Sequence, residues 1–163
     1  MDQSSRSLSE QQGLQEAVGE LVAWVSRGVV VHEARHISDV ASGRVVDGNY
    51  LCDGCEDGLS PWARAEASAY LSSLAEPGDS VALAEMCAMS VSPGKLPEHY
   101  RKAVDAVLLE LVPGGCEQIP ADLRKKARAL EVRWFGRYDR VQVEDLPESL
   151  GAEARGAIGP NRF

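Results

Sequence analysis

Apolar and polar positions near the N-terminus follow a helical period. Ser7 and Glu10 have the spacing of a capping box, a pattern typical of the first turn of a helix. Apolar residues then recur every three or four positions, as on one face of a helix, at Leu14, Val18, Leu21, Val22 and Val25. This pattern predicts a first helix that ends near Ser26, and Gly28 either ends that helix or bends it.

The segment that follows is predicted to be a second helix. It contains no helix-breaking residue before Ser42 and Gly43, so we expect a helix from about Val30 to Ala41. The run of valines at 29–31 would also suit a short strand, because β-branched residues favour strands. We take the helix as the expected structure here.

Turn dipeptides in close succession occupy residues 43–60, and the stretches 44–46 and 49–51 within them are spaced to pair as a small hairpin. Ser60 followed by Pro61 marks the start of another helix, since serine caps a helix and proline suits its first position. Apolar spacing and flanking glycine or proline residues place this helix at 62–75 and predict three later helices, at about 80–89, 99–112 and about 120–134.

The chain shows no internal repeat and no convincing linker. Residues 140–143 are expected to form an edge strand. The predicted fold class is mainly α: a compact helical domain with a small β-hairpin element, formed by residues 1–163 as a single domain. The termini, at 1–8 and about 148–163, are expected to be loosely ordered.

Composition supports a folded helical chain. Its 163 residues suit one domain with its own core, and 44% apolar with 26% charged residues argues against disorder. Aromatic residues make up only 6%, so the core should consist of Ala, Val and Leu, which favours helices over a sandwich or barrel.

Charge and hydropathy exclude two classes of partner. The net charge of −8 is the opposite of what a nucleic-acid-binding protein normally carries. The best basic cluster, within residues 124–133, is interleaved with Asp122 and Glu131 and fits a solvated helix face. No run approaches the roughly 18 apolar residues that span a bilayer, so no membrane span is expected.

The sequence leaves the location and the oligomeric state open. The first 30 residues lack the layout of a signal peptide. The four cysteines permit a secreted, periplasmic or effector origin, because disulfides persist in oxidising compartments.

One short segment, residues 32–36, carries the pattern His-Glu-x-x-His. Two residues four apart lie on the same face of a helix, so His32 and His36 can both reach one metal ion. Glu33 lies at the rim of that face, where it can take a proton from a zinc-bound water and return it to a leaving amine. The motif therefore predicts a zinc site, and a catalytic zinc needs a third protein ligand from elsewhere in the chain.

Glu66 is the best candidate for the third ligand. It lies in an Ala-rich stretch whose small side chains would let a second helix approach the first closely. The alternative is a surface glutamate paired with Arg64 or another exposed base. Glu85 is the second candidate, and His99 is more typical of a helix start.

The His-Glu-x-x-His segment resembles the active-site helix of zincin metallopeptidases, and its pairing with a later glutamate is similar to the gluzincin arrangement. More narrowly, His-Glu-Ala-Arg-His with an aspartate three residues later, followed by Glu-Ala-Ser-Ala-Tyr at 66–70, resembles short metallopeptidase domains of bacteria. Some of those are carried as toxin or effector domains, and others are secreted or lipid-anchored. The resemblance covers about residues 29–75.

The resemblance implies a zinc-dependent metallopeptidase acting on a peptide or protein substrate. It implies as zinc ligands His32, His36 and Glu66. Glu33 would be the general base and acid, and Asp39 would orient the second histidine through its far nitrogen. Tyr70 could help to hold the oxyanion, although a packing role suits it at least as well. The larger zincins align substrate on an edge strand, for which this sequence offers only weak candidates.

The cysteines support a rival interpretation. Cys52 and Cys55, fifteen residues after the histidine pair, complete a four-ligand set for a closed structural zinc site. This order of ligands resembles the His-His-Cys-Cys modules of retroviral-type integrases, and the chain would then be an interaction module without catalysis. Alternatively, Cys52, Cys55, Cys87 and Cys116 form disulfides, in any of three pairings.

A third hypothesis is a helical interaction protein that binds no metal, in which the Val and Ala stripes are simply core. Glu33 and Glu66 favour the catalytic zinc over both alternatives, because a structural site needs neither of them.

Overall fold

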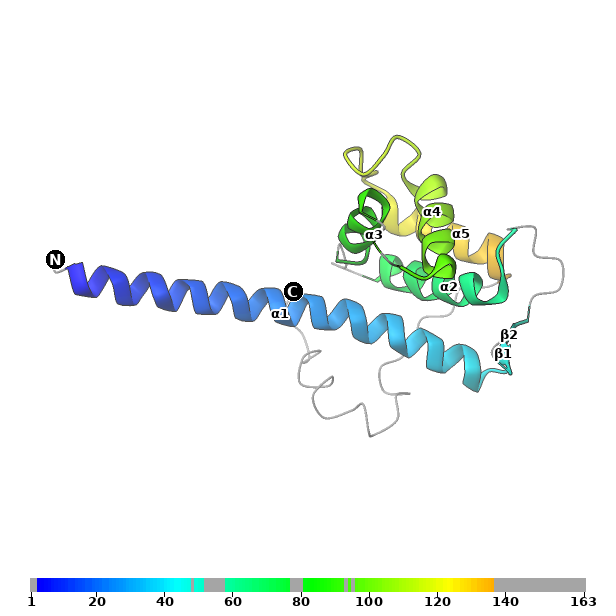
Figure 1. The fold of residues 1–163 in the computed structure, drawn as a ribbon, viewed down its shortest axis with the longest axis horizontal. Helices are drawn as coiled ribbons and strands as arrows, with labels where there is room; N and C mark the ends of the chain where they lie inside the picture. The colour runs from blue at the N-terminus through cyan, green and yellow to red at the C-terminus, as the bar shows by residue number, and fades with distance from the viewer. Residues whose placement is uncertain are drawn as a thin grey trace.

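The computed structural model describes residues 3–47, 49–51, 58–76, 81–92, 94 and 96–136, with side chains from Gln11 onward. Within these residues the chain forms five helices and one two-stranded antiparallel sheet, so the predicted mainly helical fold with a small β element is confirmed (Figure 1). The elements are α1 (Gln3–Ala41), β1 (Val45–Val46), β2 (Asn49–Tyr50), α2 (Pro61–Ala75), α3 (Val81–Val91), α4 (Glu98–Leu111) and α5 (Leu123–Phe135).

Helix α1 is one continuous helix where the sequence suggested two. It runs for 39 residues, about 58 Å at the usual rise per residue, and it passes through Gly28 without a break. Gly28 is buried, and its carbonyl accepts a hydrogen bond from Ser73 Oγ of α2 at 3.5 Å. Packing against α2 therefore outweighs the modest helix cost of a glycine.

The N-terminal half of α1 extends away from the other helices (Figure 1). The helix begins at Gln3 and so includes most of the segment that was expected to be a loose terminus. The predicted apolar stripe of this half is exposed, at Leu14, Val18, Leu21, Val22 and Val25. The expected edge strand at 140–143 and the C-terminal tail lie outside the described residues.

Helix α2 lies at the centre of the core and packs against α1, α4 and α5. It begins as predicted, with Ser60 Oγ accepting a hydrogen bond from the backbone N–H of Ala63 at 3.3 Å and Pro61 in its first turn. Four of its five alanines are fully buried, and their small side chains let neighbouring helices approach closely. The surrounding core is mainly aliphatic, as predicted, and its fully buried members include Leu71, Leu74, Met86, Val104 and Leu111.

The predicted hairpin is confirmed. Val45 pairs with Tyr50 and Val46 with Asn49. Asp47 makes the turn with a positive φ of 50°, a conformation that aspartate tolerates better than most residues. The ring of Tyr50 is buried and lies 5.4 Å from that of Phe135, which anchors the hairpin to α5.

A disulfide joins Cys87 on α3 to Cys116 in the loop after α4, with the two Cα atoms 5.9 Å apart. These two cysteines are therefore partners of each other, which the sequence left open. Cys52 and Cys55 lie outside the described residues. Within the described part of the chain, no helix is both long enough and apolar enough to cross a membrane.

Candidate metal centre

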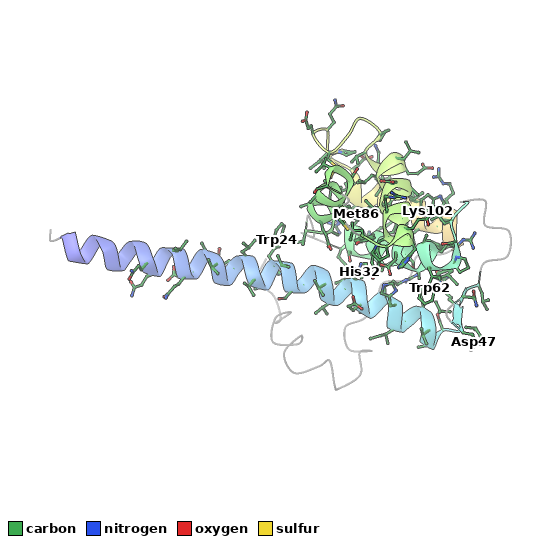
Figure 2. All side chains as sticks on the ribbon, viewed as in Figure 1. Trp24, His32, Asp47, Trp62, Met86 and Lys102 are labelled. Atoms are coloured by element: carbon green, nitrogen blue, oxygen red, sulfur yellow. A yellow bond between two sulfur atoms is a disulfide. The ribbon has the colours of Figure 1, made fainter. Side chains whose placement is uncertain are left out.

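Three potential metal ligands converge where α1 crosses α2. His32 and His36 lie one turn apart on α1, and their Nε2 atoms are 3.2 Å from each other. Glu66 of α2 faces both, with Oε2 at 3.3 Å from His32 Nε2 and Oε1 at 3.7 Å from His36 Nε2. One ligand atom from each residue falls within a group no wider than 4.8 Å. Figure 2 shows His32 on the part of α1 that passes alongside the other helices.

The donor set fits a bound cation. Two imidazole nitrogens that face each other at 3.2 Å cannot both carry a proton toward the other without repulsion. Glu66 is 6% exposed, and its Oε2 has no hydrogen bond of good geometry among the described residues despite the nearby imidazole. Two nitrogen lone pairs and a buried carboxylate oxygen are a set that zinc accepts.

The charges of the three residues are strongly coupled. Burial by itself would raise the pKa of Glu66, but the nearby imidazoles of His32 and His36, with their positive charge, lower it to about 2. Burial also opposes protonation of His36, yet its hydrogen bond to Glu66 and the negative charges nearby leave its pKa raised. Glu66 is thus an ionised carboxylate at neutral pH, and the centre favours positive charge.

A buried ionic network fixes how α1 and α2 meet. Arg35, between the two histidines, is fully buried, and its Nε donates to Ser68 Oγ at 3.0 Å and lies 3.1 Å from Asp39 Oδ1. Its Nη2 lies 3.0 Å from Glu131 Oε1 of α5. Ser68 Oγ also donates to Asp39 Oδ2 at 2.9 Å. Because Ser68 is two residues after Glu66, the same contacts set the position of the third ligand.

Sequence reasoning missed this network. The interpretation of Glu131 as part of a solvated helix face is wrong, since Glu131 is fully buried against Arg35. The spacing of Arg35 and Asp39, four residues apart on one helix, was the available signal. The proposed role of Asp39 in orienting His36 stays a prediction. Its charge does help to raise the pKa of that histidine, while its carboxylate contacts Arg35 and Ser68.

Tyr70 lies beside the centre but directs its hydroxyl elsewhere. Its ring is 4.7 Å from the ring of His32 in an edge-to-face contact. Its hydroxyl donates to Met89 Sδ at 3.8 Å, and burial, followed by the charges of Glu85 and Glu66, raises its pKa. The Tyr70 hydroxyl therefore stays protonated, as a hydrogen-bond donor must, but its proton is directed to Met89 Sδ.

Tyr100 of α4 is a second tyrosine at the centre, and sequence reasoning did not find it. Burial raises its pKa, and the charge of Glu66 and a hydrogen bond to that carboxylate raise it further. No motif marks Tyr100, because its place at the site depends on how α4 packs on α2.

A pocket of about 190 Å³ opens beside the histidines, between α1, α2, α3 and α4. Glu33 lines it from α1, Tyr100 from α4 and Glu85 from α3. The remaining lining residues are Gly28, Val29, His32, Tyr70, Ser73, Val81 and Ala82. The pocket thus leaves open space next to the three candidate ligands, with Glu33 on its wall.

The other two sequence candidates lie near the centre without joining it. Glu85 lines the pocket but is not one of the three converging ligands. His99, at the start of α4, has its ring 4.7 Å from that of Tyr100 and 6.1 Å from that of Trp62.

Comparison of the chain with protein-family models, curated proteins and solved structures finds no match.

Proposed function

We propose that this chain is a zinc-dependent metallopeptidase that hydrolyses peptide bonds. The convergence of His32, His36 and Glu66 carries the proposal, because the sequence predicts these residues as ligands and the packing of two helices brings them together. In this proposal Glu33 is the general base and acid, and the pocket beside it receives the substrate.

Three protein ligands with space beside them are typical of catalytic rather than structural zinc, which is enclosed by four protein ligands. Zinc held there would supply a Lewis acid that polarises a carbonyl group and makes water acidic enough to yield hydroxide near neutral pH. Glu66, an ionised carboxylate, would balance part of the charge of the ion.

The chain's own residues perform the proton transfers. Glu33 takes a proton from the attacking water as the water oxygen bonds to the carbonyl carbon. It then gives that proton to the nitrogen as the carbon–nitrogen bond breaks. Tyr100, on the pocket wall, donates a hydrogen bond to the negative oxygen that forms on the carbonyl carbon.

A matched pair of tyrosine variants tests the assignment of the oxyanion donor. Tyr100→Phe is expected to lower kcat by about 10²- to 10³-fold, the usual effect of losing one such donor, with the zinc content unchanged. Tyr70→Phe should cost only a few-fold, because its hydroxyl is directed to Met89. Steady-state kinetics on one peptide substrate measures both. A larger loss in Tyr70→Phe would transfer the role to Tyr70.

Zinc content of purified variants separates the proposal from its two alternatives. Glu66→Ala should weaken zinc binding by more than the roughly 10- to 100-fold that loss of an outer-shell partner costs, because it removes a direct ligand. The double variant Cys52→Ser, Cys55→Ser should bind zinc like the parent. Glu85→Gln, the other candidate ligand, should also retain it.

Elemental analysis and competition with a chelator give the readout. Loss of zinc in the cysteine variant, with retention in Glu66→Ala, would establish the structural site and an interaction module. Absence of zinc binding by the parent protein would favour the helical interaction protein that needs no metal.

A further inference from the structure

The pocket beside the metal centre contains an acidic residue that the proposed mechanism does not use. Glu85, on α3, lines the pocket, whereas Glu33 lines it from α1. The carboxylate of Glu85 is close enough to both tyrosines of the pocket that its charge raises the pKa values of Tyr70 and Tyr100.

The described residues that line the pocket provide no lysine or arginine to balance these negative charges. Among the described lining residues are two glutamates, and their one imidazole, His32, belongs to the candidate metal centre. Uncompensated carboxylates around a recess attract a positive group. Glu85 is not one of the three residues that converge as candidate metal ligands, so its charge remains available to another group.

The size and the apolar walls of the pocket indicate what that group is attached to. A volume of about 190 Å³ is below the roughly 300–1,000 Å³ of pockets that hold a whole small ligand, and it suits a single side chain. Val29, Val81 and Ala82 add apolar surface to the same lining. Long cationic side chains cover apolar surface with their methylene groups while their charged end reaches a polar partner.

We propose that this pocket binds an ammonium or guanidinium group of the peptide substrate, with Glu85 as the carboxylate that selects it. The inference rests on the proposed function, since it names the class of peptide that the same site accepts. The cation comes either from a lysine or arginine side chain beside the cleaved bond or from a free amino terminus. Both present the same chemistry to Glu85.

Cleavage of matched peptides by the zinc-loaded full chain tests the proposal. N-acetylated peptides with lysine, arginine or norleucine at randomised positions are cleaved, and mass spectrometry identifies the bonds that break. We expect kcat/KM for lysine peptides to exceed that for norleucine peptides about tenfold, the lower range for a hydrogen bond to a charged group. The same norleucine peptides with a free amino terminus show whether the terminal ammonium group, rather than a side chain, is the cation that the pocket binds.

Three variants make the result specific to Glu85. Glu85→Gln should bring the lysine-to-norleucine ratio close to one, and Glu85→Lys should turn the preference toward peptides with glutamate. Glu117→Gln, an exposed glutamate in the loop after α4, is the matched control and should keep the parent ratio. A parent ratio near one for both sources of the cation, or a ratio that Glu85→Gln leaves unchanged, would overturn the proposal.

Binding measurements keep this inference distinct from the proposed hydrolysis. The Glu33→Gln variant is titrated with the lysine and norleucine peptides, and its affinity for the lysine peptides should be higher, by a margin that shrinks with added salt. If the parent protein cleaves no peptide but this preference holds and Glu85→Gln abolishes it, hydrolysis fails and the cation site stands. Equal affinities would overturn the cation site, whatever the outcome for hydrolysis.

Discussion

Replacing Glu33 with glutamine is expected to abolish peptide hydrolysis and leave the zinc content and the fold unchanged. Glutamine has the same size and keeps the side chain's place on the pocket wall, but it cannot accept the proton of the attacking water. General base catalysis contributes about 10²- to 10⁴-fold, so kcat should fall by at least that range. Glu33 is exposed and is not one of the three converging ligands, which is why neither folding nor zinc binding should suffer.

Single-turnover and steady-state rates on a fluorogenic peptide measure the loss of hydrolysis. Elemental analysis and circular dichroism on the same samples measure the zinc content and the fold. Glu117→Gln removes one exposed carboxylate far along the chain and should retain the parent rate. If Glu33→Gln and the parent cleave every substrate at the same rate, the chain is not a metallopeptidase of the proposed kind.

Replacing Arg35 with methionine is expected to destabilise the protein by about 3–5 kcal/mol, as is typical when one partner of a buried ion pair is removed. Methionine fills similar space but leaves Asp39 and Glu131, both buried, without the guanidinium that lies 3.1 and 3.0 Å from their oxygens. The free energy of unfolding, from urea denaturation of the metal-free protein, gives the magnitude.

A second arginine provides the matched control on the surface. Arg133 of α5 lies 2.6 Å from Glu110 of α4, and both side chains are well exposed. Arg133→Met should therefore cost less than about 1 kcal/mol. If Arg35→Met costs no more than this control, the buried network does not hold α1 on the other helices.

The candidate metal ligands were predictable from sequence to the extent that they depend on one helix. His32 and His36 meet because residues four apart share a helix face, which is local geometry. Glu66 was predictable from its Ala-rich surroundings, because small residues permit close helix packing. Its carboxylate oxygens lie 3.3 Å from His32 Nε2 and 3.7 Å from His36 Nε2. This approach requires only that α1 and α2 cross at these residues.

The features that sequence reasoning missed depend on contacts between distant segments. Glu131 looked like a surface residue among lysines and arginines, but it is fully buried and pairs with Arg35 of α1. Gly28 looked like the end or a bend of a helix, but α1 continues through it, and its carbonyl contacts Ser73 of α2. No sequence motif marks Tyr100 as part of the site. The pairing of Cys87 with Cys116 requires that the loop after α4 lie next to α3. Local propensity does not contain this information.

The contacts of α1 with α2 restrict how the chain can change in length. Gly28 meets Ser73, the histidines meet Glu66, and Arg35 meets Ser68, all on one side of the helix. One residue inserted among these positions would turn everything beyond it by about 100°, and the three contacts could not form together. The exposed N-terminal half of α1 has no such constraint. Insertions and deletions should therefore be tolerated before about residue 24 and excluded between Gly28 and Asp39.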